Sequence, residues 1–118
     1  MVNSAPFTYM EFSMNNIVWR IGFENPNSDM LKRSDGSITV GVTDNNVRYV
    51  FLSNKLRGSF LRKVLIHELT HAWMFSYNYI LPIEEEEFVC DFVASNAEII
   101  IDKADELISN GLANMRYA

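Results

Sequence analysis

The stretch "RKVLIHELTHAWMF", residues 62–75, holds both histidines of the chain, His67 and His71, with Glu68 directly after the first. Apolar residues recur around them every three or four positions, which predicts a helix over about 59–77. Positions i and i+4 of a helix lie one above the other on the same face. Both imidazoles are therefore expected to reach a single cation.

The chemistry of these residues favours Zn²⁺, because two neutral imidazole nitrogens suit this ion. Glu68 lies about 100° further round the helix than His67, where it would touch a metal-bound water rather than the metal. The alternative is three polar residues that share a helix without a metal. The flanking segments "VLI" and "AWMF" are apolar, however, so unpaired polar groups there would carry a desolvation penalty. We therefore predict a zinc site of the HExxH type found in zinc peptidases.

The composition is that of an ordinary globular chain of 118 residues, 48% hydrophobic and 21% charged. This length predicts one domain spanning residues 1–118. No apolar run approaches the roughly 18 residues that span a bilayer, and the start "MVNSAPFTYM" lacks the basic and apolar regions of a signal peptide. The single cysteine, Cys90, cannot form an internal disulfide, which predicts a cytoplasmic protein with no membrane partner.

Charge is distributed unevenly along the chain, whose formal net charge is −5. Residues 1–83 carry eight Lys or Arg against six Asp or Glu, a balance of +2, and residues 84–118 carry two against nine, a balance of −7. An acidic chain without a large basic face is a poor candidate for binding nucleic acid. A small basic group is formed by Lys55, Arg57, Arg62 and Lys63. It could flank a cleft for acidic substrate segments, although a solvated loop and helix start is the simpler interpretation.

Strands are predicted in the first half of the chain. The run "IVWRIGF" at 17–23 has the period of two that is typical of a half-buried strand. Residues 37–53 predict a β-hairpin, with "DNN" at 44–46 as its turn. Segment 27–36 is either a loop or a short helix, and residues 1–16 show no clear pattern.

Two helices are predicted in the second half. The first carries the histidines, with Ser59 as its N-cap. The second runs from about 83 to 109, and "NG" at 110–111 ends it. Its expected core face comprises Phe88, Phe92, Ser95 and Ile99. This order of strands, helix and helix predicts an α+β fold in which both helices pack on one small, partly antiparallel sheet.

The third zinc ligand is left open by the residues themselves. A catalytic zinc takes three protein ligands and keeps one position for water, and the chain has no third histidine. Along two antiparallel helices joined near 78–83, His71 lies roughly 10 Å from the joint, Glu87 roughly 6 Å and Asp91 roughly 12 Å. Distance from the joint is therefore compatible with both Glu87 and Asp91 and does not decide between them. The candidates are Cys90, Glu84, Glu85, Glu86, Glu87, Asp91 and Glu98.

Two motifs in this order resemble the gluzincins, zinc peptidases whose second helix supplies a glutamate ligand. "HELTHAW" is followed by "EEEEFVCDFVASNAE". In this family the ligand glutamate is followed four positions later by an acidic or amide residue, and the residue just before that one is small. "EFVCD" at 87–91 matches that pattern. In the order of elements over 37–100, the chain is similar to the small members, the ImmA/IrrE-like peptidases of bacteria and phages and the minimal gluzincins. It departs from the ImmA/IrrE type in a shorter interval between the motifs and in lacking "ExEA".

The resemblance implies a zincin-like fold and Glu87 as the third ligand, with Glu86 or Asp91 as the alternatives. Asp91 is then expected behind the site, because a metal-bound histidine usually donates its other ring N–H to a carboxylate. The alternative for Asp91 is a charge on the helix surface. Cys90 is expected to be a small packed residue rather than a ligand.

These residues predict a zinc-dependent metallopeptidase that cleaves peptide or protein substrates. Zn²⁺ would be held by His67, His71 and Glu87, and Glu68 would take a proton from the bound water and pass it to the leaving amine. An exposed strand of the 37–53 hairpin could pair with an extended substrate. The oxyanion would need a further donor, for which the candidates are Tyr49, Tyr77, Tyr79 and Tyr117.

The alternative function is a catalytically inactive zincin-like domain that binds a metal and acts as a protein-interaction module. Glu68 argues against it, because a structural zinc site needs no general base and is normally closed by four protein ligands. By analogy with minimal gluzincins, the tail at 112–118 could lie across the cleft. No feature of the sequence indicates the oligomeric state.

Overall fold

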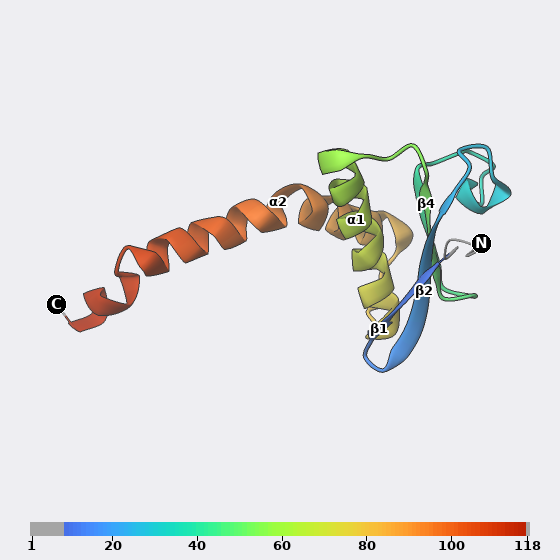
Figure 1. Cartoon of the computed structure of the whole chain (residues 1–118). Coiled ribbons are helices and arrows are strands. Elements are labelled where there is room, and N and C mark those ends of the chain that lie inside the picture. The colour runs from blue at the N-terminus through green and yellow to red at the C-terminus, as the bar shows by residue number, and fades with distance from the viewer. Residues whose placement is uncertain (1–8, 118) are drawn as a thin grey trace, which may run out of the picture.

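The computed structural model describes residues 9–117 and has an α+β architecture, with a four-stranded mixed sheet and two long helices (Figure 1). This confirms the predicted α+β class and the small, partly antiparallel sheet, whereas the expected packing of both helices on the sheet holds mainly for α1. The elements in chain order are β1 (Met10–Met14), β2 (Ile17–Glu24), the 3-10 helix η1 (Asp29–Leu31), β3 (Gly41–Asp44), β4 (Tyr49–Ser53), α1 (Gly58–Ser76), α2 (Ile83–Ser109) and the 3-10 helix η2 (Leu112–Tyr117). None of the helices described combines the length and the hydropathy that crossing a membrane requires.

Two antiparallel hairpins form the sheet, whose strand order is β1-β2-β4-β3. β2 and β4 pair in parallel at its centre. The predicted hairpin at 37–53 is confirmed as β3–β4, with shorter strands and a turn at 45–48. The β1–β2 hairpin, in a region without a predicted pattern, turns on Asn15 and Asn16, whose φ values of 52° and 62° suit a two-residue turn of type I′. In the strand order given above β3 comes last, so it is an edge strand of the sheet, and it lies against α1.

The core lies between the sheet and α1, and its buried residues are Trp19, Val50, Leu52, Leu56, Val64 and Ala72. Trp19 of β2 is fully buried, and its indole Nε1 donates to Ser76 Oγ at 2.8 Å. Asn15 Nδ2 donates to the backbone oxygen of Ser76 at 3.0 Å. The C-terminal end of α1 is thus fixed to the β1–β2 hairpin, and the histidines in the middle of α1 take a fixed position over the sheet.

The N-cap predicted for α1 is wrong. Arg57 occupies the N-cap position without a side-chain cap hydrogen bond, and Gly58 follows it with a φ of 56°. Because this left-handed residue turns the chain into the helix, Ser59 already lies in the first turn. The Arg57 guanidinium instead donates to the backbone oxygens of Asn54 and Leu56 at 2.6 Å and 2.7 Å. These bonds close the connection between β4 and α1.

α2 spans residues 83–109 as predicted. Asn110 caps it and Gly111 follows with a φ of 95°, which matches the predicted "NG" ending. Its first half packs mainly on α1 rather than on the sheet, and Figure 1 shows its second half projecting away from the body. η2 lies at the far end of this projection, so residues 112–117 do not lie across the histidines as the family analogy suggested.

The predicted core face of α2 is also wrong. Its three large apolar residues are between 48% and 68% exposed, and the whole set is exposed: Phe88, Phe92, Ser95 and Ile99. The helix instead turns Glu86 and Cys90 inward, with exposed fractions of 6% and 0%. Apolar periodicity did not indicate this face because it begins with a carboxylate that pairs with a histidine of α1.

Candidate metal centre

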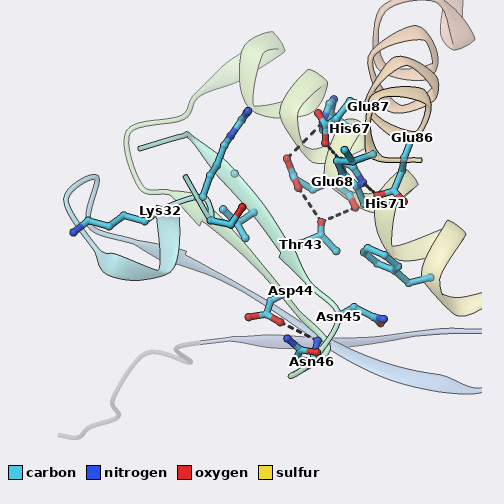
Figure 2. Close-up of a pocket in the computed structure, with 16 residues that line it drawn as sticks. Lys32, Thr43, Asp44, Asn45, Asn46, His67, Glu68, His71, Glu86 and Glu87 are labelled. Atoms are coloured by element: carbon cyan, nitrogen blue, oxygen red, sulfur yellow. Dashed lines mark hydrogen bonds and ion pairs between the residues drawn. The ribbon is translucent and has the colours of Figure 1, made fainter. Parts of the chain in front are cut away.

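Three side chains from two helices converge on one point. His67 and His71 lie in the middle of α1, and Glu87 lies in the second turn of α2. One potential ligand atom of each lies within 4.8 Å of the others. His71 Nε2 is 2.8 Å from Glu87 Oε1, and His67 Nε2 is 3.5 Å from Glu87 Oε2. The three residues expected as zinc ligands are thus brought together, with Glu87 reaching over both imidazoles (Figure 2).

Two further carboxylates lie behind the histidines. His67 Nδ1 is 2.9 Å from Asp91 Oδ1, and His71 Nδ1 is 2.6 Å from Glu86 Oε2. A carboxylate at this distance accepts the Nδ1 proton of a neutral imidazole, which fixes the tautomer and orients the ring. The Nε2 lone pair of each histidine therefore faces Glu87. Asp91 lies where it was expected, and Glu86, an alternative ligand, lies behind His71 instead.

This donor set has the character of a cation site. With both Nδ1 protons directed to carboxylates, the two Nε2 lone pairs and the Glu87 carboxylate are three acceptors that face one another. Acceptors do not hydrogen-bond to each other, so the arrangement requires either a cation or one more proton among the three groups. Two imidazole nitrogens and one carboxylate oxygen are a ligand set that catalytic zinc takes, with a fourth position open. The residues present fit the expected ion.

The remaining candidates for the third ligand lie elsewhere. Glu84 and Glu85 are exposed in the first turn of α2, and Glu98 pairs with Arg62 Nε at 2.7 Å. Cys90 is fully buried, as expected of a small packed residue. Burial, reinforced by the neighbouring carboxylates, raises the pKa of its thiol to about 12. The thiol is therefore protonated near neutral pH and is a poor metal ligand.

Glu68 lies beside the three converging residues without joining them. It is 6% exposed, and its Oε2 is 3.9 Å from His67 Nε2. Thr43 Oγ1 lies 2.8 Å from Glu68 Oε1 and 2.9 Å from the Glu68 backbone oxygen, so these two acceptors share the one hydroxyl proton (Figure 2). Burial raises the pKa of the Glu68 carboxyl, against the opposite effects of the Thr43 hydroxyl and the two histidines. Glu68 is thus a carboxylate with increased proton affinity at the edge of the candidate site.

Strand β3 fixes Glu68 from the side of the sheet. Besides the Thr43 hydrogen bond, Gly41 approaches so closely that a Cβ there would lie 3.0 Å from Glu68 Cγ, from Glu68 Oε2 and from Val64 Cγ1. A larger residue at position 41 would therefore displace the Glu68 side chain. Sequence reasoning missed Thr43 and Gly41, because the hairpin pattern does not say which strand lies against α1.

A cavity of about 480 Å³ opens in front of the three converging residues. The edge strand β3 and its turn, residues 41–46, form one wall, and α1 with the start of α2 forms the other. Lys32 and Arg33 add basic side chains to its lining. Lys63, from the basic group noted in the sequence, lines a neighbouring hollow of about 200 Å³ together with Arg33.

The tyrosines suggested as oxyanion donors lie away from this cavity. Tyr49 and Tyr77 each stack on a neighbouring aromatic ring, at centroid distances of 4.2 Å and 4.0 Å. Tyr79 follows the end of α1 and is 58% exposed. The side chain of Tyr117 lies outside the described part of the chain. Tyr49, Tyr77 and Tyr79 are therefore not placed to supply this donor.

Comparison with known proteins gives no relative from which a function could be transferred. No protein-family model matches the chain, and no curated protein or solved structure matches it. The likeness to gluzincins therefore remains a prediction from two sequence motifs. Any inference about function depends on the geometry of the residues described above.

Proposed function

We propose that the protein is a zinc-dependent metallopeptidase with a zincin-like fold. The observation that carries the proposal is the convergence of three acceptor groups, on His67, His71 and Glu87, with both imidazoles oriented by carboxylates. A buried glutamate, Glu68, lies directly beside this group. A structural zinc site would be closed by a fourth protein ligand and would have no use for such a base.

The ligands and the base have separate roles in this proposal. His67, His71 and Glu87 would hold Zn²⁺ and leave one position open towards the cavity. Bound zinc would supply a Lewis acid that lowers the pKa of a water towards ~7 and polarises a peptide carbonyl. Glu68 accepts a proton from the attacking water and passes it to the nitrogen of the leaving amine as the peptide bond breaks. Its position beside His67, buried from solvent, suits both transfers, because the carboxylate lies next to the point where the water would be held.

Thr43 and Gly41 act through Glu68 as positioning residues. The Thr43 hydroxyl contacts Glu68 at Oε1 and at the backbone oxygen, and Oε2 is the atom that lies on the side of His67 to take the proton. Gly41 provides the space in which the Glu68 side chain lies flat against β3. Both contacts restrict the rotamers of the base, and a catalytic group held in one geometry loses less entropy on reaction.

The edge strand gives the expected form of the substrate. β3 pairs with β4 along one side only, and the residues of β3 line the cavity. An extended peptide can add to such a free edge as a further strand, which would lay its backbone across His67 and His71.

The test compares zinc-loaded wild type with Glu68→Gln on a proteome-derived peptide library. Glutamine keeps the shape of the side chain but does not accept the proton, so hydrolysis should fall by ~10²–10⁴-fold. Zinc content and Tm should stay at the wild-type values, because Glu68 is not one of the three converging ligands. Glu85→Gln, in the exposed first turn of α2, is the matched control and should cleave as wild type does.

Three outcomes contradict the proposal in different ways. Equal cleavage by wild type and Glu68→Gln removes Glu68 as the base. No cleavage by zinc-loaded wild type supports the alternative function, a catalytically inactive metal-binding domain that acts as an interaction module. A protein that holds no divalent metal after purification without chelators or histidine tags, and that cannot be loaded, excludes both functions.

A further inference from the structure

The second half of α2 is a helix with no covering layer in the described part of the chain. Every residue from 98 to 110 is exposed. The molecule measures 62 × 43 × 28 Å, and its radius of gyration is 17.9 Å, against about 13 Å for a compact domain of roughly 100 residues. Figure 1 shows that this elongation comes from α2, which continues beyond α1 into open space.

The exposed half carries an apolar stripe in line with the buried face of the first half. Ile108 follows Cys90 by about five turns at 3.6 residues per turn, so the two side chains share one side of the helix. The stripe, called the distal stripe below, comprises Ile100, Ile101, Ala104, Leu107 and Ile108. Its four large side chains are between 46% and 62% exposed. The face that packs on α1 therefore continues past the end of α1, where no residue of 9–117 covers it.

A row of acidic residues borders the distal stripe on one side. Glu98, Asp102 and Asp105 follow each other at spacings of four and three, which places them along one flank of the helix. Arg62 of α1 pairs with the first of them, Glu98, at 2.7 Å. Asp102 and Asp105 form no ion pair with any residue in 9–117. α1 thus contacts α2 through apolar side chains beside an Arg–Glu pair. Asp102 and Asp105 lie in the same position relative to the apolar face, one and two turns further along α2.

We propose that the distal stripe and its acidic row bind an amphipathic helix of another protein, one whose apolar face is bordered on one side by Arg or Lys. Such a helix would pack on the second half of α2 as α1 packs on the first half. Its apolar face would cover the distal stripe, and its basic side chains would meet Asp102 and Asp105 as Arg62 meets Glu98. This surface is remote from the histidines, so the inference does not depend on the peptidase proposal.

The charges select such a helix over a second copy of this chain. In an antiparallel pair of α2 helices each flank lies against the same flank of the other copy, which would set Asp102 and Asp105 against each other. In a parallel pair the two α1 helices would meet, because each already covers the face of its own α2 next to the stripe. The one basic residue on the opposite flank, Lys103, is 3.1 Å from Glu106 of its own helix.

The test uses two labelled 18-residue helical peptides with the whole chain at low ionic strength. Both carry one leucine stripe, bordered by Arg in the first peptide and by Glu at the same positions in the second. Fluorescence anisotropy should show the Arg peptide binding about tenfold tighter than the Glu peptide, because two exposed ion pairs replace two repulsions. The double change Asp102→Asn with Asp105→Asn should remove this difference, and Ile101→Ser with Ile108→Ser should abolish binding of both peptides.

The controls separate charge, stripe and fold. Glu84→Gln with Glu85→Gln removes the same number of charges from the other end of α2 and should leave the tenfold difference intact. Near-UV circular dichroism should be unchanged in all variants, because each altered residue is exposed. Equal binding of the two peptides, binding of neither, or binding that survives the Ile101 and Ile108 changes would overturn the proposal. A concentration-dependent dimer in sedimentation that the same two changes dissociate would also overturn it, in favour of a second copy.

Discussion

The two halves of α2 belong to one helix but have different surroundings. Residues 83–97 pack against α1 and carry Glu86, Glu87 and Asp91, each within 2.9 Å of a histidine nitrogen. Residues 98–109 are also rich in acidic side chains, but all are exposed. The comparison teaches that acidic residues of one helix orient and hold other groups where a second helix covers them. Where no part of residues 9–117 covers them, as in the second half of α2, we propose that they form a surface for another molecule.

Burial also grades the effects expected in the first half. The side chain of Glu86 is 8% exposed, that of Glu87 is 37% exposed, and that of Asp91 is 72% exposed. Solvent screens an exposed ion pair, so such a pair contributes little energy. Of the two residues behind a ligand, the buried Glu86 should therefore matter more than the exposed Asp91. Glu87 should matter most for a different reason, because it is proposed to bind the ion directly.

The largest effect on zinc affinity is expected from Glu87→Ala. It removes one of three proposed ligands, so affinity measured by competition with a chelating indicator should fall by more than about 100-fold. Glu106→Ala, the same change in the exposed half of α2, should leave affinity unaltered. A crystal structure with Glu86 or Asp91 at about 2.0–2.2 Å from the zinc would refute the assignment of Glu87 while leaving the enzyme class open.

An intermediate effect is expected from Glu86→Gln. The amide is neutral, so His71 Nδ1 loses the charge that raises the basicity of its ring, and zinc affinity should fall by about 10–100-fold. Glu85→Gln, one residue earlier and exposed, is the control and should bind zinc as wild type does. An affinity that is equal in both variants would show that the buried carboxylate does not orient His71 for metal binding.

A smaller effect is expected from Asp91→Asn. Asp91 contacts His67 in the same way as Glu86 contacts His71, but solvent surrounds most of its side chain. Zinc affinity should therefore fall by less than about tenfold, in the same titration. A larger loss than that of Glu86→Gln would reverse the order set by burial and would indicate that His67 needs its carboxylate more than His71 does.

Local periodicity explains how much of this molecule could be predicted from sequence. Both helices and the 37–53 hairpin follow from patterns of period 3.6 and 2 within single segments. His67, His71 and Glu68 were predicted together because the helix itself sets their spacing. Glu87 was one of several acidic candidates on the second helix, and only the resemblance to gluzincins favoured it. The parallel pairing of β2 with β4 was not predicted, because it joins segments whose contact depends on the whole chain.

The errors have the same physical origin. The buried face of α2 was missed because Glu86 lies on it, and a hydrophobic pattern does not count a carboxylate as buried. Its spacing of four from Cys90 was the available signal that both residues share one face. For Thr43 no local signal existed, since its hydrogen bond to Glu68 depends on how the hairpin lies against α1.

The smallest effect is expected from removing residues 101–118, which deletes most of the exposed half of α2. No buried side chain is lost from the part of α2 that is removed, and the Arg62–Glu98 pair remains, so the core and the candidate site should keep their contacts. The shortened helix loses its cap at Asn110 and frays by about a turn, and Tm in a calorimetric scan should fall by less than about 5 °C. Zinc affinity should stay within about twofold of the full chain, while the Arg-bordered peptide should no longer bind. A fall in Tm of more than about 10 °C, or a loss of zinc, would show that the exposed half supports the fold after all and would remove the contrast between the two halves of α2.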